Sequence, residues 1–512
     1  MSNPISGALI KSGLRISRTV NPNGLDPSSS QERTLYNLLN KACNTAFGKH
    51  FGFNKILNER DLTHAFAERV PIYDYDSIYA EWWSRSLAGE DNVTWKGTVP
   101  YYALSSGTTG APSKFIPITH DMISSMRTAG IKMYSGLTIT DLPIKTYSKH
   151  MIMLGGNTKL NQGKGYLYGD LSGILVQKLP VWLTKRYKPG LTIASIKDYH
   201  EKMLAIAKEA PNWDIGFISG IPSWIQMMLE YIIEYNRIDN IHQIWPNLQV
   251  YAHGGTAFNP YKGGIQKLMG KPVKFLDSYL ASEGFIGYQS KMDAPGMELN
   301  YNCGLYFEFI PFNQENFDAY GNLLPGVGTI TIDEVEENVN YAILLSTCAG
   351  SWRYLIGDTV KFIDKANSQI IITGRTKHFL SICSEHLSVD NMNEAIKTVQ
   401  KNLNINIREF TVCGVKANTH YMHKWYVSSE PVVFNSRIIC EELDRQLKLL
   451  NDDYAATRKA VLDHPELVAL PPKVFYDYMA SIGKIGGQAK FPRVMQEKQF
   501  AEWEIFVQNY QL

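Results

Sequence analysis

Between residues 150 and 280, apolar and polar positions alternate in blocks that predict strands and helices in turn. Four short apolar runs have the length of buried strands: Met151–Leu154, Ile215–Ser219, Leu248–His253 and Val273–Tyr279. Stretches with helical spacing follow at about 195–209 and 223–235, and others occur at about 31–47 and 119–134. Strands that alternate with helices in this way form a mainly parallel sheet with helices on both faces.

From about residue 301 the pattern changes to short strands separated by turns, which predicts an antiparallel β subdomain. The expected strands are Gly304–Pro311, Gly328–Glu334, Tyr341–Thr347, Thr359–Asp364 and Gln369–Thr373. The remaining chain combines helices at about 390–401 and 436–450 with strands at about 409–415 and 424–428. We therefore predict an α/β protein with a large N-terminal domain, residues 1–375, and a small α+β C-terminal domain, residues 376–512.

Composition narrows the class of protein. A chain of 512 residues exceeds what one hydrophobic core organises, so more than one domain is expected. The formal net charge of +2 gives no reason to expect a nucleic acid or an anionic membrane as partner. The six cysteines are scattered without a C-x-x-C pair, and no apolar run has the length of a signal peptide or a membrane span. These features predict a cytoplasmic protein.

One stretch has the composition of a phosphate-binding loop. The apolar run that ends at Leu104 is followed by Ser105-Ser106-Gly107-Thr108-Thr109-Gly110, and Lys114 lies four residues further on. Backbone N–H groups, hydroxyls and a lysine can together surround phosphate oxygens. The glycines are too close for the usual G-x-x-x-x-G-K-[ST] loop. Serine, threonine and glycine also dominate ordinary surface loops, so that alternative stays open.

Four further motifs lie at the ends of expected strands. Gly254-Gly255 and Ser282-Glu283 each follow a strand of the parallel sheet, where ligands bind beyond the carboxyl ends of the strands. Tyr279 could stack on a base, and Glu283 could hold Mg²⁺, although a core tyrosine and a surface glutamate are the plain alternatives. Gly357-Asp358 could bind a ribose or simply form a β-turn, and Gly374-Arg375 ends the antiparallel region.

The order of these motifs resembles the acyl-adenylate-forming superfamily of firefly luciferase and the acyl-CoA ligases. The finer resemblance is to the auxin-responsive, Gretchen-Hagen-type acyl acid amido synthetases of plants and bacteria, from about residue 35 to the end. It is carried by Val70-Pro-Ile-Tyr-Asp-Tyr, Lys114-Phe-Ile-Pro, Trp352-Arg-Tyr, Leu380-Ser-Ile and Gly487-Gln-Ala-Lys-Phe-Pro-Arg493. Ala281-Ser-Glu-Gly-Phe-Ile-Gly287 is similar to the bacterial members.

The resemblance implies roles for these residues. Ser105, Ser106 and Thr108, with Gly107 and Thr109 in the same loop, would hold the phosphates of ATP, and Gly254-Gly255 would lie along the adenine. Tyr279 would stack on the adenine, Ser282 would meet the α-phosphate, Glu283 would bind Mg²⁺, and Asp358 would bind the ribose near Arg375. Lys490 would enter the cleft when a mobile C-terminal domain closes, although a solvated surface lysine is the alternative.

The predicted function is ATP-dependent adenylation of a small carboxylic acid, followed by transfer to the amino group of an amino acid. An acyl-CoA ligase and a non-catalytic nucleotide-binding relative are the alternatives. The Gly-Gln-Ala-Lys-Phe-Pro-Arg ending favours the amide product, because it differs from the Ser-Gly-Lys ending common in the ligases. The sequence leaves open the acid, the amine and the oligomeric state. Helix 119–134 and Ile221–Met228 could line an acyl pocket or lie in the core.

Overall fold

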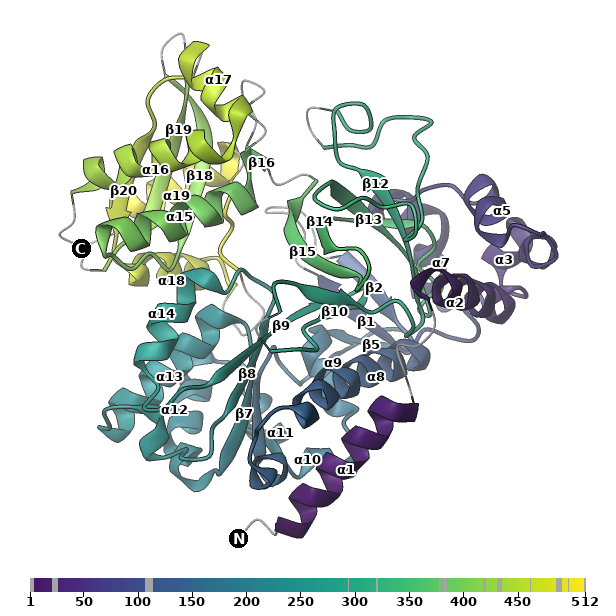
Figure 1. Cartoon of the computed structure of the whole chain (residues 1–512), viewed down its shortest axis with the longest axis horizontal. Coiled ribbons are helices and arrows are strands. Elements are labelled where there is room, and N and C mark those ends of the chain that lie inside the picture. The colour runs from purple at the N-terminus through teal and green to yellow at the C-terminus, as the bar shows by residue number, and fades with distance from the viewer. Residues whose placement is uncertain are drawn as a thin grey trace.

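The structure is a computed structural model (Figure 1). It describes residues 4–20, 26–105, 114–292, 294–318, 321–376, 379–380, 385, 387–417, 420–430, 435–460, 462–484, 490–495 and 497–510. In the described part of the chain, no helix is long and apolar enough to cross a membrane.

An eleven-stranded sheet runs through the molecule, in the order β12-β13-β14-β15-β11-β10-β9-β8-β7-β3-β6. One half is parallel and comprises β6 (Tyr187–Lys188), β3 (His150–Leu154), β7 (Ile215–Gly220), β8 (Val250–Gly254) and β9 (Lys274–Ala281). The other half is antiparallel and comprises β10 (Gly284–Tyr288), β11 (Met297–Leu299), β12 (Leu305–Pro311), β13 (Asn340–Thr347), β14 (Tyr354–Asp364) and β15 (Gln369–Arg375). The two halves join at the β9–β10 turn, Ser282-Glu283.

The predicted α/β fold with parallel and antiparallel parts is confirmed, with two corrections. The antiparallel strands continue the main sheet, because β10 returns along β9 and the hydrogen-bonded ladder does not stop there. The strand expected at Gly328–Glu334 is absent apart from one bridge between Phe309 and Ile330. There the backbone N–H of Thr331 donates to Glu334 Oε2 at 2.8 Å, so a local turn replaces the ladder.

A second sheet of four strands carries the glycine-rich loop. Its order is β2-β1-β5-β4, with β1 at Tyr101–Ser105, β2 at Lys114–Ile118, β5 at Leu167–Gly169 and β4 at Asn161–Gln162. β1 and β2 pair antiparallel, so the loop between them connects a hairpin rather than a strand of the parallel sheet. β1, which precedes the loop, therefore belongs to a different sheet from the strands that precede Gly254-Gly255 and Ser282-Glu283.

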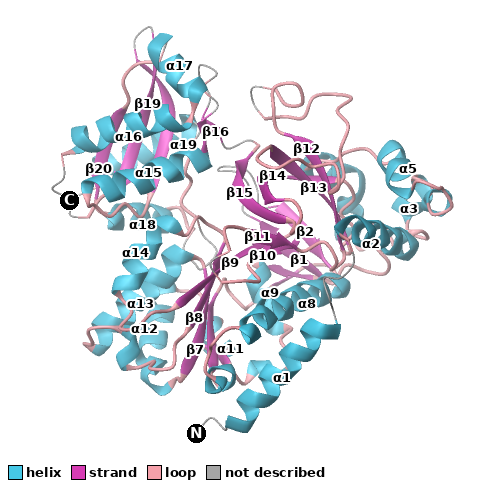
Figure 2. Cartoon of the chain, in the orientation of Figure 1, coloured by secondary structure: helices cyan, strands magenta, loops and turns pink. Residues whose placement is uncertain are grey.

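Helices cover the faces of the main sheet (Figure 2). α12 (Tyr199–Glu209), α13 (Pro222–Asn236) and α14 (Asn259–Lys267) flank the parallel strands, and apolar side chains of α12, α13 and α14 share a core with β3, β7 and β8. α8 (His120–Gly136) packs into a separate core with the antiparallel strands. Most of its apolar residues, and most of those of α13, lie in these cores, and none of them lines the large cavity of the molecule.

The N-terminal helices differ from the expected 31–47 helix. α2 (Pro27–Ala42) begins earlier because Asp26 accepts a hydrogen bond from the Ser29 N–H at 3.2 Å and caps it. It ends before Thr45, whose hydroxyl caps the separate α3 (Ala46–His50). The remaining helices of this part are α1 (Pro4–Val20), α4 (Phe53–Ile56), α5 (Leu62–Arg69), α6 (Tyr75–Ile78), α7 (Ser84–Leu87), α9 (Leu171–Gln177), α10 (Val181–Thr184) and α11 (Leu191–Ala194).

The C-terminal part has its own sheet and its own apolar clusters. β18 (Phe410–Ala417), β19 (His420–Ser428) and β20 (Glu466–Leu470) form a three-stranded sheet, and β16 (Phe379–Leu380) pairs with β17 (Leu387–Ser388). Its helices are α15 (Val389–Leu403), α16 (Ser436–Leu450), α17 (Asp452–Ala460), α18 (Pro472–Ser481) and α19 (Glu497–Asn509). Two clusters consist only of residues beyond 379. The domain boundary at residue 375 stays a prediction.

Candidate active site

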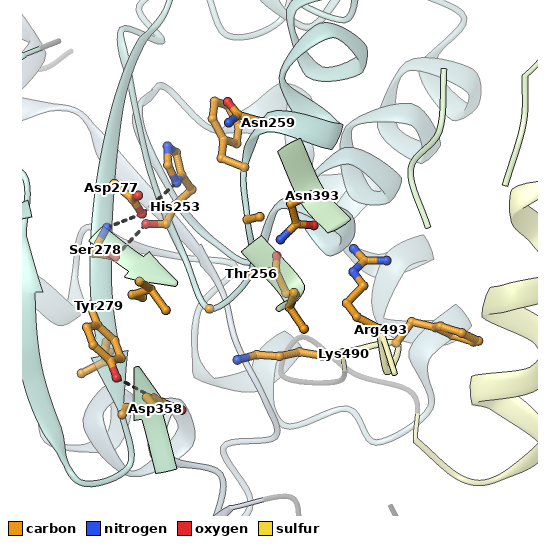
Figure 3. Close-up of a pocket in the computed structure, with 18 of the residues that line it drawn as sticks. His253, Thr256, Asn259, Asp277, Ser278, Tyr279, Asp358, Asn393, Lys490 and Arg493 are labelled. Atoms are coloured by element: carbon orange, nitrogen blue, oxygen red, sulfur yellow. Dashed lines mark hydrogen bonds and ion pairs between the residues drawn. The ribbon is translucent and has the colours of Figure 1, made fainter. Parts of the chain in front are cut away.

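A cavity of about 1520 Å³ opens between the main sheet and the C-terminal part (Figure 3). Eight of the predicted site residues line it: Ser105, Gly255, Tyr279, Ser282, Glu283, Asp358, Arg375 and Lys490. Gly254 ends β8 beside them without lining the cavity. Ser106, Gly107, Thr108 and Thr109 lie outside the described residues. Residues nearly 400 positions apart in the sequence therefore meet in one space.

A bulge in β14 presents Asp358 to the cavity. Gly357 has a φ of +84°, a conformation that side-chain-bearing residues rarely adopt. Here β14 has extra residues relative to β13, since Leu355 pairs with Leu344 while Thr359 pairs with Ala342. The sequence predicted that Gly-Asp ends a strand, which is wrong, because β14 continues to Asp364. A bulge re-aims one side chain without ending the ladder, and here that side chain is a carboxylate.

Both carboxylate oxygens of Asp358 have partners. Arg375 Nε lies 2.7 Å from Oδ1, and the Tyr279 hydroxyl donates to Oδ2 at 2.5 Å. Burial, together with the charge of Asp358, raises the pKa of Tyr279 well above its ordinary value, so its hydroxyl keeps the proton that it donates. Tyr279 belongs to the core and also lines the cavity, and its ring is held in place by Asp358.

Glu283 adds a second carboxylate to the same space. It lies in the tight turn between β9 and β10. Burial raises the pKa of Glu283, and the negative charge of Asp358 acts in the same direction, while Arg375 and Lys114 oppose it. Two carboxylates that disfavour each other's charge are stabilised by a bound cation, and oxygen ligands of this kind suit Mg²⁺.

Lys490 brings a positive charge from the other end of the chain. In Figure 3 its side chain extends from the C-terminal part toward Tyr279 and Asp358. The Lys490 side chain lies inside the protein, yet it is exposed because it projects into the open space of the cavity. A side chain at Gly255 would approach Lys490 Cε to 3.5 Å, which places the lysine against the turn after β8. Enclosure lowers the pKa of the ammonium, whereas Asp358 and Glu283 raise it.

A buried polar cluster fixes the segment that carries Lys490. Arg493 donates to Glu409 Oε2 at 2.7 Å and to the Tyr261 hydroxyl at 3.1 Å, and Tyr261 donates to Glu409 Oε1 at 2.6 Å. Tyr261 belongs to α14 beside the parallel sheet, while Glu409 precedes β18. Nearby, Arg408 forms ion pairs of 2.9 Å with Glu230 of α13 and with Glu430. These contacts join the C-terminal part to α13 and α14.

Several residues that line the cavity were not singled out from the sequence. His253, Thr256, Asn259 and Asn393 face it in Figure 3, and Asp170 and Lys202 line it as well. Thr256 follows the Gly254-Gly255 turn directly, so its position after a strand could have indicated it. Asp170, Lys202 and Asn393 sit in or beside helices with ordinary patterns, and only the tertiary fold brings them to the cavity.

The fold is shared with two solved structures of low sequence identity. A solved structure of a GH3.15 acyl acid amido synthetase superposes with a TM-score of 0.77 and 15% identity, covering 96% of this chain and 95% of that one. A 2-hydroxyisobutyryl-CoA ligase in its postadenylation state superposes with a TM-score of 0.60 and 12% identity, covering 94% and 92%.

Models of one protein family match most of the chain. The N-terminal, central and C-terminal domain models of the GH3 family match residues 24–210, 299–374 and 390–499. The chain belongs to the GH3 family. Among its relatives, an indole-3-acetic acid-amido synthetase of Arabidopsis thaliana is 20% identical over 73% of this chain and 79% of its own length. A jasmonoyl-L-amino acid synthetase of Nicotiana attenuata is 25% identical over 52% and 48%.

Proposed function

We propose that this protein is an AMP-forming acyl acid amido synthetase. It adenylates a small carboxylic acid with ATP and transfers the acyl group to the amino group of an amino acid. One observation carries the proposal: Lys490 of the C-terminal part lies in the same cavity as Tyr279, Glu283, Asp358 and Arg375. Family membership and the amido synthetases among the relatives support the amide product over a thioester.

The residues of the cavity fit ATP and Mg²⁺. Asp358 keeps acceptor capacity for ribose hydroxyls, since each carboxylate oxygen accepts more than one hydrogen bond. The Tyr279 ring and the Gly254-Gly255 turn would flank the adenine. Ser105, Ser106, Gly107, Thr108 and Thr109 would hold the phosphates, with Ser282 at the α-phosphate. Glu283 would bind Mg²⁺, which when present neutralises charge on the phosphate oxygens.

The chemistry requires positioning and charge rather than a protein nucleophile. In the first step a carboxylate oxygen of the acid bonds to the α-phosphorus of ATP, and pyrophosphate leaves. Lys490 and Arg375 would stabilise the negative charge that develops between the phosphates. In the second step the nitrogen of the neutral amine bonds to the acyl carbon, the bond to AMP breaks, and the nitrogen releases one proton to the solvent. Adenylation activates the acid because AMP is a good leaving group, whereas attack on the free carboxylate would have to expel an oxide ion.

Lys490 serves the first step only, in this proposal. Residues 376–512 would form a mobile domain that turns about a joint near Gly374-Arg375, as domain closure completes many active sites. The arrangement seen here, with Lys490 in the cavity, would be the one that carries out adenylation. We further propose a cytoplasmic location, in keeping with the scattered cysteines.

The test is acid-dependent exchange of radiolabelled pyrophosphate into ATP. A panel of aryl and indole acids, with jasmonate-type acids added because of the relatives, is screened first without any acceptor. Acids that support exchange are then combined with each of the common amino acids, and the nucleotide product is analysed. We expect exchange, AMP and an amide. ADP with phosphate would reject adenylation, and a product formed only with coenzyme A would replace the amide by a thioester.

A further inference from the structure

Lys202 is a buried cation that has no hydrogen-bond or ion-pair partner among the residues that the structure describes. Lys202 is 8% exposed, and it lines the large cavity. Among the described residues, no acceptor lies within hydrogen-bond distance of its ammonium group. Burial lowers the pKa of Lys202, and the negative charge of Asp170 offsets this shift only in part. A lysine of this kind is stabilised when an anion enters the cavity.

An oppositely charged group faces the same cavity without pairing with this lysine. Asp170 lies just before α9, and its Oδ2 accepts a hydrogen bond from the Asn157 N–H at 2.9 Å. Asp170 and Lys202 are close enough for each charge to shift the pKa of the other, but they form no ion pair. Burial raises the pKa of Asp170, so this carboxylate too is stabilised by a partner from outside the protein.

The backbone is shaped to hold this arrangement. A side chain at Gly156 would approach Asp170 Oδ2 to 2.0 Å, so only glycine allows the carboxylate to lie against the turn after β3. The Gly156 N–H donates to Ser172 Oγ at 2.8 Å, which joins that turn to α9. Asn157 therefore holds Asp170 directly, and the bond from Gly156 to Ser172 holds the first turn of α9 beside it.

This pair lies away from the proposed nucleotide residues. In the sheet, β7 and β8 separate β3 from β9, which leads to Ser282 and Glu283. Three strand spacings place β3 about 14 Å from β9. That separation leaves room between them for an acyl group and one further small molecule.

We infer that Lys202 and Asp170 form the binding site for the amino-acid acceptor. The ammonium of Lys202 pairs with the α-carboxylate of the amino acid, and the Asp170 carboxylate pairs with its ammonium group. A cation and an anion that face one space without touching match a zwitterion, whereas polyphosphate would meet repulsion from Asp170. This inference rests on the proposed function, because it names residues for the second substrate of that reaction.

The experiment compares acceptors with and without a carboxylate. The best amino acid from the screen, its α-carboxamide and hydroxylamine are each offered to the wild-type enzyme and to Lys202→Gln, with the same acid and ATP. We expect the variant to raise the KM for the amino acid at least tenfold. The carboxamide and hydroxylamine, which lack the carboxylate, should react equally well with both enzymes.

Three controls make the result specific. Lys208→Gln, an exposed lysine on the same helix, should leave every parameter unchanged. Asp170→Asn should raise the KM for the amino acid and leave the rate with hydroxylamine intact. Lys202→Gln should also unfold at the same or a higher temperature than the wild type, because it removes an unpaired buried charge.

Other outcomes overturn the inference. A higher KM for ATP in pyrophosphate exchange would assign Lys202 to the polyphosphate. An equal rise in KM for the amino acid and for its carboxamide would show that Lys202 does not bind the carboxylate. Pyrophosphate exchange needs no acceptor, so its absence from the wild-type enzyme would reject the proposed function itself, whereas a defect confined to transfer bears only on this site.

Discussion

Two buried cations, Arg353 and Lys202, have opposite surroundings. Arg353 is 5% exposed, and each nitrogen of its guanidinium group has a partner, at Glu308, Thr329 and the carbonyls of Ala67 and Val70. Lys202 is 8% exposed and has none among the described residues. The first faces packed protein, and the second faces a cavity.

The presence or absence of partners distinguishes a charge that stabilises the fold from a charge that is available to bind a ligand. Burying a charge is costly unless it is paired, so a folded protein keeps an unpaired one only where something else compensates for it. Arg353 finds that compensation within the fold. Lys202 does not find it in the described part of the chain, and the proposed acceptor amino acid would supply it.

The largest expected effect comes from breaking the structural pair. Glu308→Gln removes the negative charge 2.9 Å from Arg353 and leaves a buried guanidinium group uncompensated. We expect a loss of about 3–5 kcal/mol in the free energy of unfolding, measured by urea denaturation. Glu90→Gln, which breaks the exposed pair with Arg85, should leave the denaturation midpoint unchanged. Equal behaviour of the two variants would show that burial does not distinguish these pairs.

A smaller effect is expected from removing the shared carboxylate of the cavity. Asp358→Ala deletes the proposed acceptor for the ribose and leaves Tyr279 and Arg375 without their partner. We expect ATP to bind more weakly by roughly 1.5–3 kcal/mol, measured by calorimetry. Asp364→Ala, at the end of the same strand and outside the cavity, serves as the control. An unchanged affinity of Asp358→Ala for ATP would show that Asp358 does not bind the ribose.

Glu283→Gln tests the second carboxylate through pH. Because burial raises the pKa of Glu283, the ionised form opposes folding at neutral pH. The variant should therefore be more stable than the wild type at neutral pH. The advantage should shrink as the pH falls through the raised pKa and vanish below the unfolded value. Adenylation should lose its dependence on Mg²⁺ together with most of its rate. A variant with wild-type rate and metal dependence would take Glu283 out of the site.

The smallest effect is expected at the contact that positions Lys490. Tyr261→Phe removes a hydroxyl that bridges Glu409 and Arg493. Losing a hydrogen bond of about 1 kcal/mol should slow adenylation roughly fivefold, with less effect on transfer from a supplied acyl-adenylate. Tyr235→Phe, an exposed tyrosine of α13, is the matched control. Equal slowing of both steps would show that Tyr261 does not act through Lys490.

Much of the fold was predictable because apolar periodicity follows the buried faces of β3, β7, β8, β9 and α13. The same pattern could not show that the antiparallel strands extend the main sheet, since ladder pairing depends on distant partners. The site residues Gly255, Ser282 and Glu283 were predictable because they follow strands directly. The bulge at Asp358 was not, because its residues also suit a turn.

Lys202 marks the limit of such prediction. In the sequence it stands between Glu201 and Met203 on an amphipathic helix, where a lysine is normally solvated. Only the packing of α12 against the sheet places it in the cavity. Its significance comes from the absence of a described partner, which is a property of the fold.

Lys490 and Lys202 are assigned to different half-reactions, and single-turnover kinetics of Lys490→Ala tests this assignment most directly. Formation of acyl-adenylate from acid and ATP is followed in one experiment, and transfer from supplied acyl-adenylate to the amino acid in the other. Removing one stabilising charge should slow adenylation by about 10²–10³-fold and affect transfer far less. Equal losses in both half-reactions, or an unchanged rate of adenylation, would contradict the account.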